Sequence, residues 1–184
     1  MFSEKRIAQV AAYLLAKGGG RLPTIKLMKL MYLADRESLR RWGHTISEDV
    51  MGSMDNGPVL SRTLDYIHGE IRSADNGWDS WIADAENYEV RLQKQPSRRE
   101  LDEVSDAAIE VLDAVWGQFG GYGKWDLVEY THKNCPEWRH PQGTFIRFGY
   151  QEVLVALGVP EAQAAAQATE LNALDEIDGV LARI

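Results

Sequence analysis

The clearest pattern of apolar positions lies between Thr24 and Trp42. On a helix of 3.6 residues per turn, one set of apolar side chains shares a face and a second set widens that face beyond half of the circumference. The first set is Leu27, Leu30, Met31 and Ala34, and the second is Met28, Tyr32, Leu39 and Trp42. A helix this apolar must be covered on several sides. The pattern therefore predicts the central helix of the core.

The remaining arc of this helix carries cations, which are Lys26, Lys29, Arg36 and Arg40. One interpretation is an ordinary solvated face. The other is a ridge that binds acidic groups of a partner protein. The pattern alone leaves both open.

Helical spacing recurs along most of the chain. It predicts helices over 3–17, 97–119, 124–133, 144–157 and 161–184. Ser3 is expected to cap the first of these, and Ser97 with Glu100 has the spacing of a capping box. Residues 48–69 are expected to form two helical pieces divided at Asn56-Gly57-Pro58, with Pro58 in the first turn of the second piece.

A period of two replaces the helical period after Asn76-Gly77. Alternating apolar residues predict a small β-hairpin around residues 78–93, with Trp78 and Trp81 docking it on the helices. The predicted fold class is therefore mainly α, a single compact helical domain with one small hairpin. Residues 1–160 are expected to form the domain, and residues 161–184 a C-terminal helical extension.

The extension is rich in alanine and acidic. It has a weak apolar stripe and a stronger one nearer the C-terminus, which consists of Ile177, Val180, Leu181 and Ile184. Two outcomes are compatible with this pattern: the helix packs on the domain, or it projects and is ordered by a partner.

Composition narrows the class of protein. The chain has 184 residues, a formal net charge of −8 and one cysteine, Cys135, so no intramolecular disulfide can form. No apolar run approaches the ~18 residues of a membrane span, and the N-terminus does not resemble a signal peptide, so a cytoplasmic location without membrane contact is expected. Counting gives net +4 for residues 1–50 and −12 for the rest. An acidic protein is a poor general nucleic-acid binder, and this charge is better suited to a basic protein partner.

Three segments together resemble the SocA-like Panacea domain family of antitoxins. The first holds Lys26, Leu27, Lys29, Leu30 and Tyr32, the second is Gly57-Pro58-Val59, and the third contains Trp125, His132 and Trp138. The resemblance runs from about residue 5 to about residue 141. The chain departs from the family pattern at Asn56, where an aromatic is usual, and at Ser53-Met54, where the family has Ala-Trp.

The resemblance implies an antitoxin that neutralises a cognate protein toxin by direct contact. It also implies that the motif residues are scaffold more than contact surface. Two alternatives stay open. One is another interaction protein, an adaptor that delivers the toxin to a cytoplasmic protease, and the other is a DNA-binding autoregulator.

Two kinds of chemistry are alternatives to binding alone. His132, Cys135 and His140 have a spacing that could contribute to a zinc site, but a fourth ligand is missing from the pattern. Cys135 with a histidine base could act as a hydrolytic nucleophile. Nothing in the sequence indicates an activated thiolate, so no catalytic residue, metal ligand or cofactor is predicted.

Overall fold

The structure, a computed structural model, describes residues 1–85 and 87–181. Its helices are α1 (Glu4–Lys17), α2 (Thr24–Trp42), α3 (Ser61–His68), α4 (Asp106–Phe119), α5 (Lys124–Asn134), α6 (Tyr150–Ala156) and α7 (Glu161–Leu181), with a short 3-10 turn, η1 (Trp78–Ser80). Its strands are β1 (Arg21–Pro23), β2 (Met51–Met54), β3 (Gly57–Leu60), β4 (Ile82–Ala85), β5 (Glu89–Leu92) and β6 (Ile146–Arg147). Helices dominate, and two small sheets accompany them, so the fold is helix-rich and mixed.

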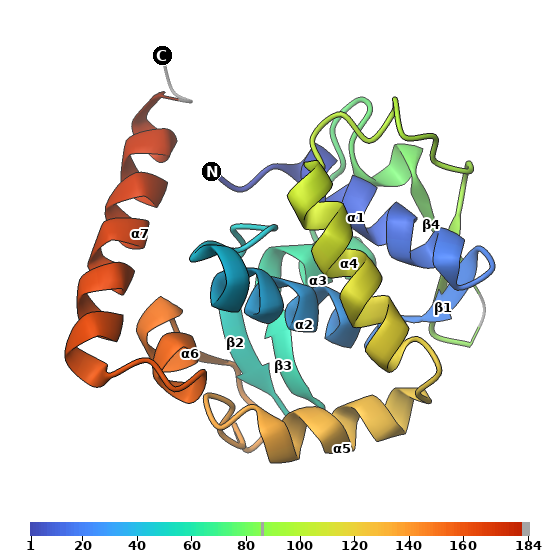
Figure 1. Cartoon of the computed structure of the whole chain (residues 1–184). Helices are drawn as coiled ribbons and strands as arrows, with labels where there is room; N and C mark the ends of the chain where they lie inside the picture. The colour runs from blue at the N-terminus through green and yellow to red at the C-terminus, as the bar shows by residue number, and fades with distance from the viewer. Residues whose placement is uncertain (86, 182–184) are drawn as a thin grey trace.

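Helix α2 runs through the middle of the molecule, and α4 crosses over it (Figure 1). It packs against α1, α4, α5 and β3, and most of its side chains are buried. The prediction of a central helix covered on several sides is confirmed. Trp42 is an exception, because this last residue of the helix extends beyond the elements that cover it and is half-exposed. Gly43, at a φ of 75°, ends the helix as expected.

The predicted hairpin is present as β4 and β5, which pair antiparallel from Ile82 opposite Leu92 to Ala85 opposite Glu89. Strand β1 adds to β5 and gives a three-stranded sheet of order β1-β5-β4. Trp78 and Trp81 are buried, and the ring of Trp78 stacks on that of Tyr66 from α3. The sequence pattern located the hairpin, because alternation is visible locally, but it missed β1, whose three residues carry no such signal.

The expectation of two helical pieces across residues 48–69 is wrong in its first half. Strands β2 and β3 form a tight hairpin around Asp55-Asn56, and β6 joins β2 to give a second sheet of order β3-β2-β6. Gly57-Pro58-Val59 therefore belongs to a strand, and α3 begins only at Ser61. Pro58 is accommodated because β3 is an edge strand of this sheet. Asn56-Gly57 was the local signal, since this dipeptide is typical of hairpin turns.

The helix predicted to begin at Ser97 begins at Asp106 instead, with Ser105 as its cap. The capping-box contact exists, because the backbone N–H of Ser97 donates to the Glu100 carboxylate at 3.0 Å. However, the buried side chain of Gln9 donates to the carbonyl of Glu100 at 2.9 Å and accepts from the N–H of Glu103 at 3.0 Å. A polar side chain from α1 thus takes the backbone groups that a helix there would have paired.

The predicted helix over 144–157 is also shorter than expected, because Ile146 and Arg147 pair with β2 and α6 begins at Tyr150. After it, α7 stands along one flank of the molecule and meets the body mainly through α6 (Figure 1). The side chains of residues 178–184 lie outside the described part of the structure, so the predicted second stripe of α7 is visible only at Ile177. The end of the predicted extension, residues 182–184, is likewise outside it.

Candidate functional site

Lys29 is buried in the core, with 1% of its surface exposed, although the sequence pattern placed it on an exposed cationic arc. That placement is wrong, because β3 lies against the arc. The Nζ of Lys29 donates to the carbonyl of Pro58 at 2.7 Å. Burial lowers the pKa of Lys29 to about 7, since the site offers a carbonyl but no carboxylate within hydrogen-bond reach. A lysine that the sequence pattern places at the surface is therefore buried, and its hydrogen bond links α2 to β3.

Gly57 is required where these two elements meet α5. Its φ is +101°, and a Cβ at this position would lie 2.8 Å from the Oγ1 of Thr131 and 3.0 Å from the Cε of Lys29. Both the backbone conformation and the close approach exclude a side chain. Pro58 then has its carbonyl held towards Lys29. The glycine of the second motif is thus explained by the lysine of the first.

Tyr32 and Arg36 converge on Glu137, one helical turn apart on α2. The Oη of Tyr32 donates to Oε1 of Glu137 at 2.5 Å, and Nε of Arg36 donates to the same oxygen at 2.7 Å. Burial, and then the charge of Glu137, raises the pKa of Tyr32 well above its ordinary value, so its hydroxyl stays a donor. Hydrogen bonds to an ionised partner are stronger than neutral ones, so this pair anchors the segment after α5 to the central helix.

His132 and Trp138 stack on one another, with ring centroids 3.8 Å apart and planes 9° from parallel. The indole Nε1 of Trp138 donates to the carbonyl of Met54 at 2.9 Å. The next residue, Arg139, donates its backbone N–H to Ser53 at 3.1 Å. The third motif therefore covers the β2–β3 hairpin. Burial, followed by the charge of Lys29, lowers the pKa of His132, which favours the neutral ring.

The polar motif residues from three distant segments thus meet at one place, which we call the motif junction. It consists of Lys29, Tyr32, Gly57, Pro58, His132, Glu137 and Trp138. Leu27 and Leu30 are fully buried beside it and Val59 is buried on β3. Within the junction, Glu137 also pairs with Arg36, whose side chain is 17% exposed and so reaches the surface.

Trp125 is the one aromatic motif residue that lies outward. It is 58% exposed on α5, with the ammonium of Lys124 5.5 Å from its ring. Tyr122, just before α5, is also exposed. The position of Trp125 fits a contact residue better than a core residue, because large exposed aromatics are enriched at the centres of interfaces.

The other cations of the predicted ridge have internal partners. Lys26 donates to the carbonyl of Gly120 at 2.7 Å, and its ammonium lies 5.7 Å from the ring of Trp116. Arg40 is paired with Glu37 at 2.6 Å, but 54% of its side chain is exposed. The arc is therefore divided: Lys29 is inside, Lys26 and Arg36 hold neighbouring segments, and Arg40 remains accessible.

The arrangement gives no support to the two chemical alternatives. Within residues 1–85 and 87–181, no group of three His, Cys, Asp or Glu side chains is placed to hold a metal ion. Cys135 is buried, and burial, followed by the charge of Glu137, raises the pKa of its thiol to about 12. A thiol in such a site stays protonated and unreactive.

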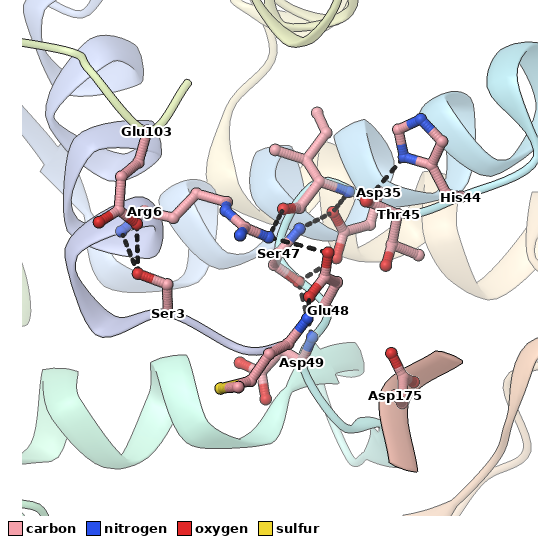
Figure 2. Close-up of polar contacts among 12 residues, drawn as sticks. Ser3, Arg6, Asp35, His44, Thr45, Ser47, Glu48, Asp49, Glu103 and Asp175 are labelled. Atoms are coloured by element: carbon pink, nitrogen blue, oxygen red, sulfur yellow. Dashed lines mark hydrogen bonds and ion pairs between the residues drawn. The ribbon is translucent and has the colours of Figure 1, made fainter. Parts of the chain in front are cut away.

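A second polar network, which the sequence pattern missed, fixes residues 45–50 (Figure 2). Asp35 accepts from the backbone N–H groups of Ile46 and Ser47, each at 2.9 Å, and burial raises its pKa to about 6. Asp49 accepts from the N–H of Thr63 at 2.8 Å and so satisfies a free donor in the first turn of α3. The available signal was Asp35 itself, an acid within an apolar helix pattern.

This network borders a groove of about 260 Å³ between the body and α7. The groove is lined by side chains of both signs and by aromatic rings, among them Phe2, Glu48, Arg62, Arg147, Tyr150 and Asp175. Tyr150 donates to Asp175 at 3.0 Å and so links α6 to α7 across one end of the groove (Figure 2 shows Asp175).

Residues 27–139 match the family described as Antitoxin SocA-like, Panacea domain. The match covers more than half of the chain, so the protein belongs to this family of antitoxin-like Panacea domains. All the residues of the motif junction lie within the matched residues, and α7 lies outside them. Comparison with curated proteins gave no significant match, and comparison with solved structures gave none either. No helix in the described part of the chain is long and apolar enough to cross a membrane.

Proposed function

We propose that this protein is a cytoplasmic antitoxin that neutralises a cognate protein toxin by binding it directly. The observation that carries the proposal is the family match over residues 27–139. The motif junction supports it, because the side chains of Lys29, Tyr32 and Trp138 donate hydrogen bonds that hold distant segments of the chain together, and burial keeps the Cys135 thiol protonated. Such a molecule acts by presenting a rigid surface.

Rigidity matters to this mechanism. A surface that is already ordered before the complex forms loses less conformational entropy on binding. Because the junction ties α2, the β2–β3 hairpin and the segment after α5 to one another, the surfaces around them are held in place. The toxin would then be blocked by occupation of its active site or of its path to substrate.

The test is co-expression with the product of the adjacent gene. That product alone should arrest growth, and this protein should restore growth and co-purify with it. A neighbour that is harmless alone, or that never co-purifies, would refute the assignment.

Within this function, Arg40 and Trp125 are the motif-related residues best placed to touch the toxin. Arg40→Glu and Trp125→Ala test the cationic arc and the exposed aromatic separately. Lys29→Glu is unsuitable as a contact test because that residue is buried and its loss would disturb folding. If both exposed variants bind with unchanged affinity, the contact surface lies elsewhere on the molecule.

A further inference from the structure

Helix α7 has one face that is covered by the rest of the chain. Ala164 and Ala168 are buried, and Leu171 packs against the hydrophobic core at partial exposure. These residues follow the i, i+4, i+7 spacing of a single helix face. The contact is made mainly with α6, so this face accounts for the way α7 is attached.

The opposite face of α7 is also apolar, but in the described structure it faces outward. Its exposed apolar residues are Ala162, Ala166, Ala173, Leu174 and Ile177. Leu174 is 58% exposed and Ile177 is 56% exposed. From residue 162 to residue 177 the face extends for about 22 Å at 1.5 Å per residue. A helix that is apolar on two opposite sides is expected to be covered on both.

The charges on α7 indicate what covers this outer face. The ionisable residues from 161 to 181 are all acidic: Glu161, Glu170, Asp175, Glu176 and Asp178. Glu170 stands one turn after Ala166 and one turn before Leu174, so it lies on the same side of the helix as these two residues, and it is exposed. A surface complementary to it needs an apolar floor with lysine or arginine at the edges.

The same charges argue against other occupants. A second α7 packed on this face would oppose carboxylates to carboxylates with no cation between them, which costs free energy. Phosphates of nucleic acid and of anionic lipid are repelled for the same reason. A basic protein surface is the occupant that the charge pattern favours.

We propose that the outer face of α7 is the principal docking surface for the toxin, and that it enters an apolar groove of the toxin edged by basic side chains. The inference rests on the antitoxin function proposed above. It adds the binding element, which lies outside the family-matched residues, and the chemistry of the partner's groove. Helix-in-groove recognition of this kind uses apolar side chains at i, i+3 and i+4 as anchors, and Leu174 and Ile177 have the i, i+3 spacing.

The attachment of α7 suits this use. Ala164 and Ala168 hold its first half on α6, and the hydroxyl of Tyr150 binds Asp175 further along. The helix is thus fixed before the partner arrives, which reduces the entropy lost on binding.

The experiment measures affinity for the purified product of the adjacent gene. Two variants act on independent properties of the face: Leu174→Ser with Ile177→Ser removes the apolar anchors, and Glu170→Lys with Glu176→Lys reverses the charge. Each should raise Kd about tenfold or more, as expected for the loss of a hot spot. The charge-reversed variant should also bind with a weaker dependence on salt than the wild type.

Matched controls carry the same substitutions elsewhere on the surface. Ile71→Ser with Ile146→Ser replaces two other exposed isoleucines, which are 36% and 40% exposed, and Glu110→Lys reverses an exposed acid on α4. Both should keep wild-type affinity. Because all the substituted side chains are exposed, every variant should retain the wild-type circular dichroism spectrum and melting temperature, which are recorded before affinity is compared.

The outcomes separate this inference from the antitoxin function. If the wild-type protein neither binds nor neutralises the neighbour, both proposals fall. If the wild type neutralises it and both α7 variants bind equally well, the antitoxin function stands and the α7 docking surface is refuted. The surface is also refuted if the variants change only the mass of the free protein in sedimentation, which would make it a self-association face, or only toxin turnover by a protease.

Discussion

In the motif junction, charged and aromatic side chains are turned inward and bind one another, whereas on α7 apolar side chains are turned outward and bind nothing in the described chain. The junction holds Lys29, a cation whose ammonium donates to a backbone carbonyl, whereas every ionisable side chain of α7 is acidic. The buried polar residues of the junction stabilise the fold, whereas the outer apolar face of α7 stays exposed in the described chain. Family motifs can therefore identify a scaffold without identifying the surface that binds a partner.

The largest effect is expected from Gly57→Ala, which places a Cβ in the junction. The strained φ and the contact with Thr131 should together lower the free energy of unfolding by about 3 kcal/mol. Gly20→Ala is the control, because Gly20 has a φ of +90° with open space around it and should lose only about 1 kcal/mol. Urea unfolding of both variants measures the difference. Equal losses would mean that the close approach at Gly57 carries no energy.

The next effect concerns the hydrogen bond between Tyr32 and Glu137. Tyr32→Phe removes a buried donor from an ionised acceptor and should cost about 2 kcal/mol. The control is Tyr13→Phe, because Tyr13 donates to Asp113 at 2.6 Å near the surface, where the loss should stay below about 0.5 kcal/mol. Chemical denaturation of the two variants tests whether burial makes the Tyr32–Glu137 hydrogen bond contribute more to the free energy of unfolding than the exposed Tyr13–Asp113 bond does.

The third effect is a pH dependence that comes from Lys29. Its pKa is lowered to about 7 in the folded protein, whereas the unfolded chain retains the ordinary value of 10.5. Between these values the unfolded state binds more protons, so this residue makes stability rise with pH, by roughly 1 kcal/mol per pH unit from about pH 7 to 9. Below pH 7 both states are protonated and the slope disappears.

Other groups also titrate in this range, so the measurement is the difference between the wild type and Lys29→Met across pH 6–9. The free energy of unfolding of the wild type minus that of Lys29→Met should increase with pH above 7. Lys133→Met, at an exposed lysine on α5, is the control and should run parallel to the wild type. A Lys29→Met curve that is parallel as well would show that the lysine is charged in the folded protein.

The smallest effect compares the two faces of α7. Ala164→Leu overfills the covered face and should weaken the attachment of α7 by about 1 kcal/mol, seen as faster amide hydrogen exchange in α6 and α7. Ala166→Leu lies on the outer face, has a similar helix propensity and should leave exchange unchanged. If the second substitution also accelerates exchange, the outer face is already packed against the body.

Patterns of apolar residues predicted secondary structure best in elements that bury one face and expose the other. The helical period identified α1, α2 and α5, and alternation identified the β4–β5 hairpin. Apolar periodicity failed at β2 and β3, where the local signal was the Asn56-Gly57 turn, and it gave no indication that Lys29 and Trp138, far away in the chain, donate to carbonyls of this hairpin. It failed again before α4, where the side chain of Gln9 takes backbone groups that local rules assign to a helix.

The sequence by itself determined the central apolar helix, the helical character of most of the chain and the residues that mark the family, because these follow from local periodicity and from residue types at fixed spacing. Only the tertiary structure decided that Lys29 is internal, that Gly57 must lack a side chain and that α7 is covered on one side alone. The physical reason is that burial depends on which distant segment lies against a face, and helical spacing describes the face without describing its neighbour.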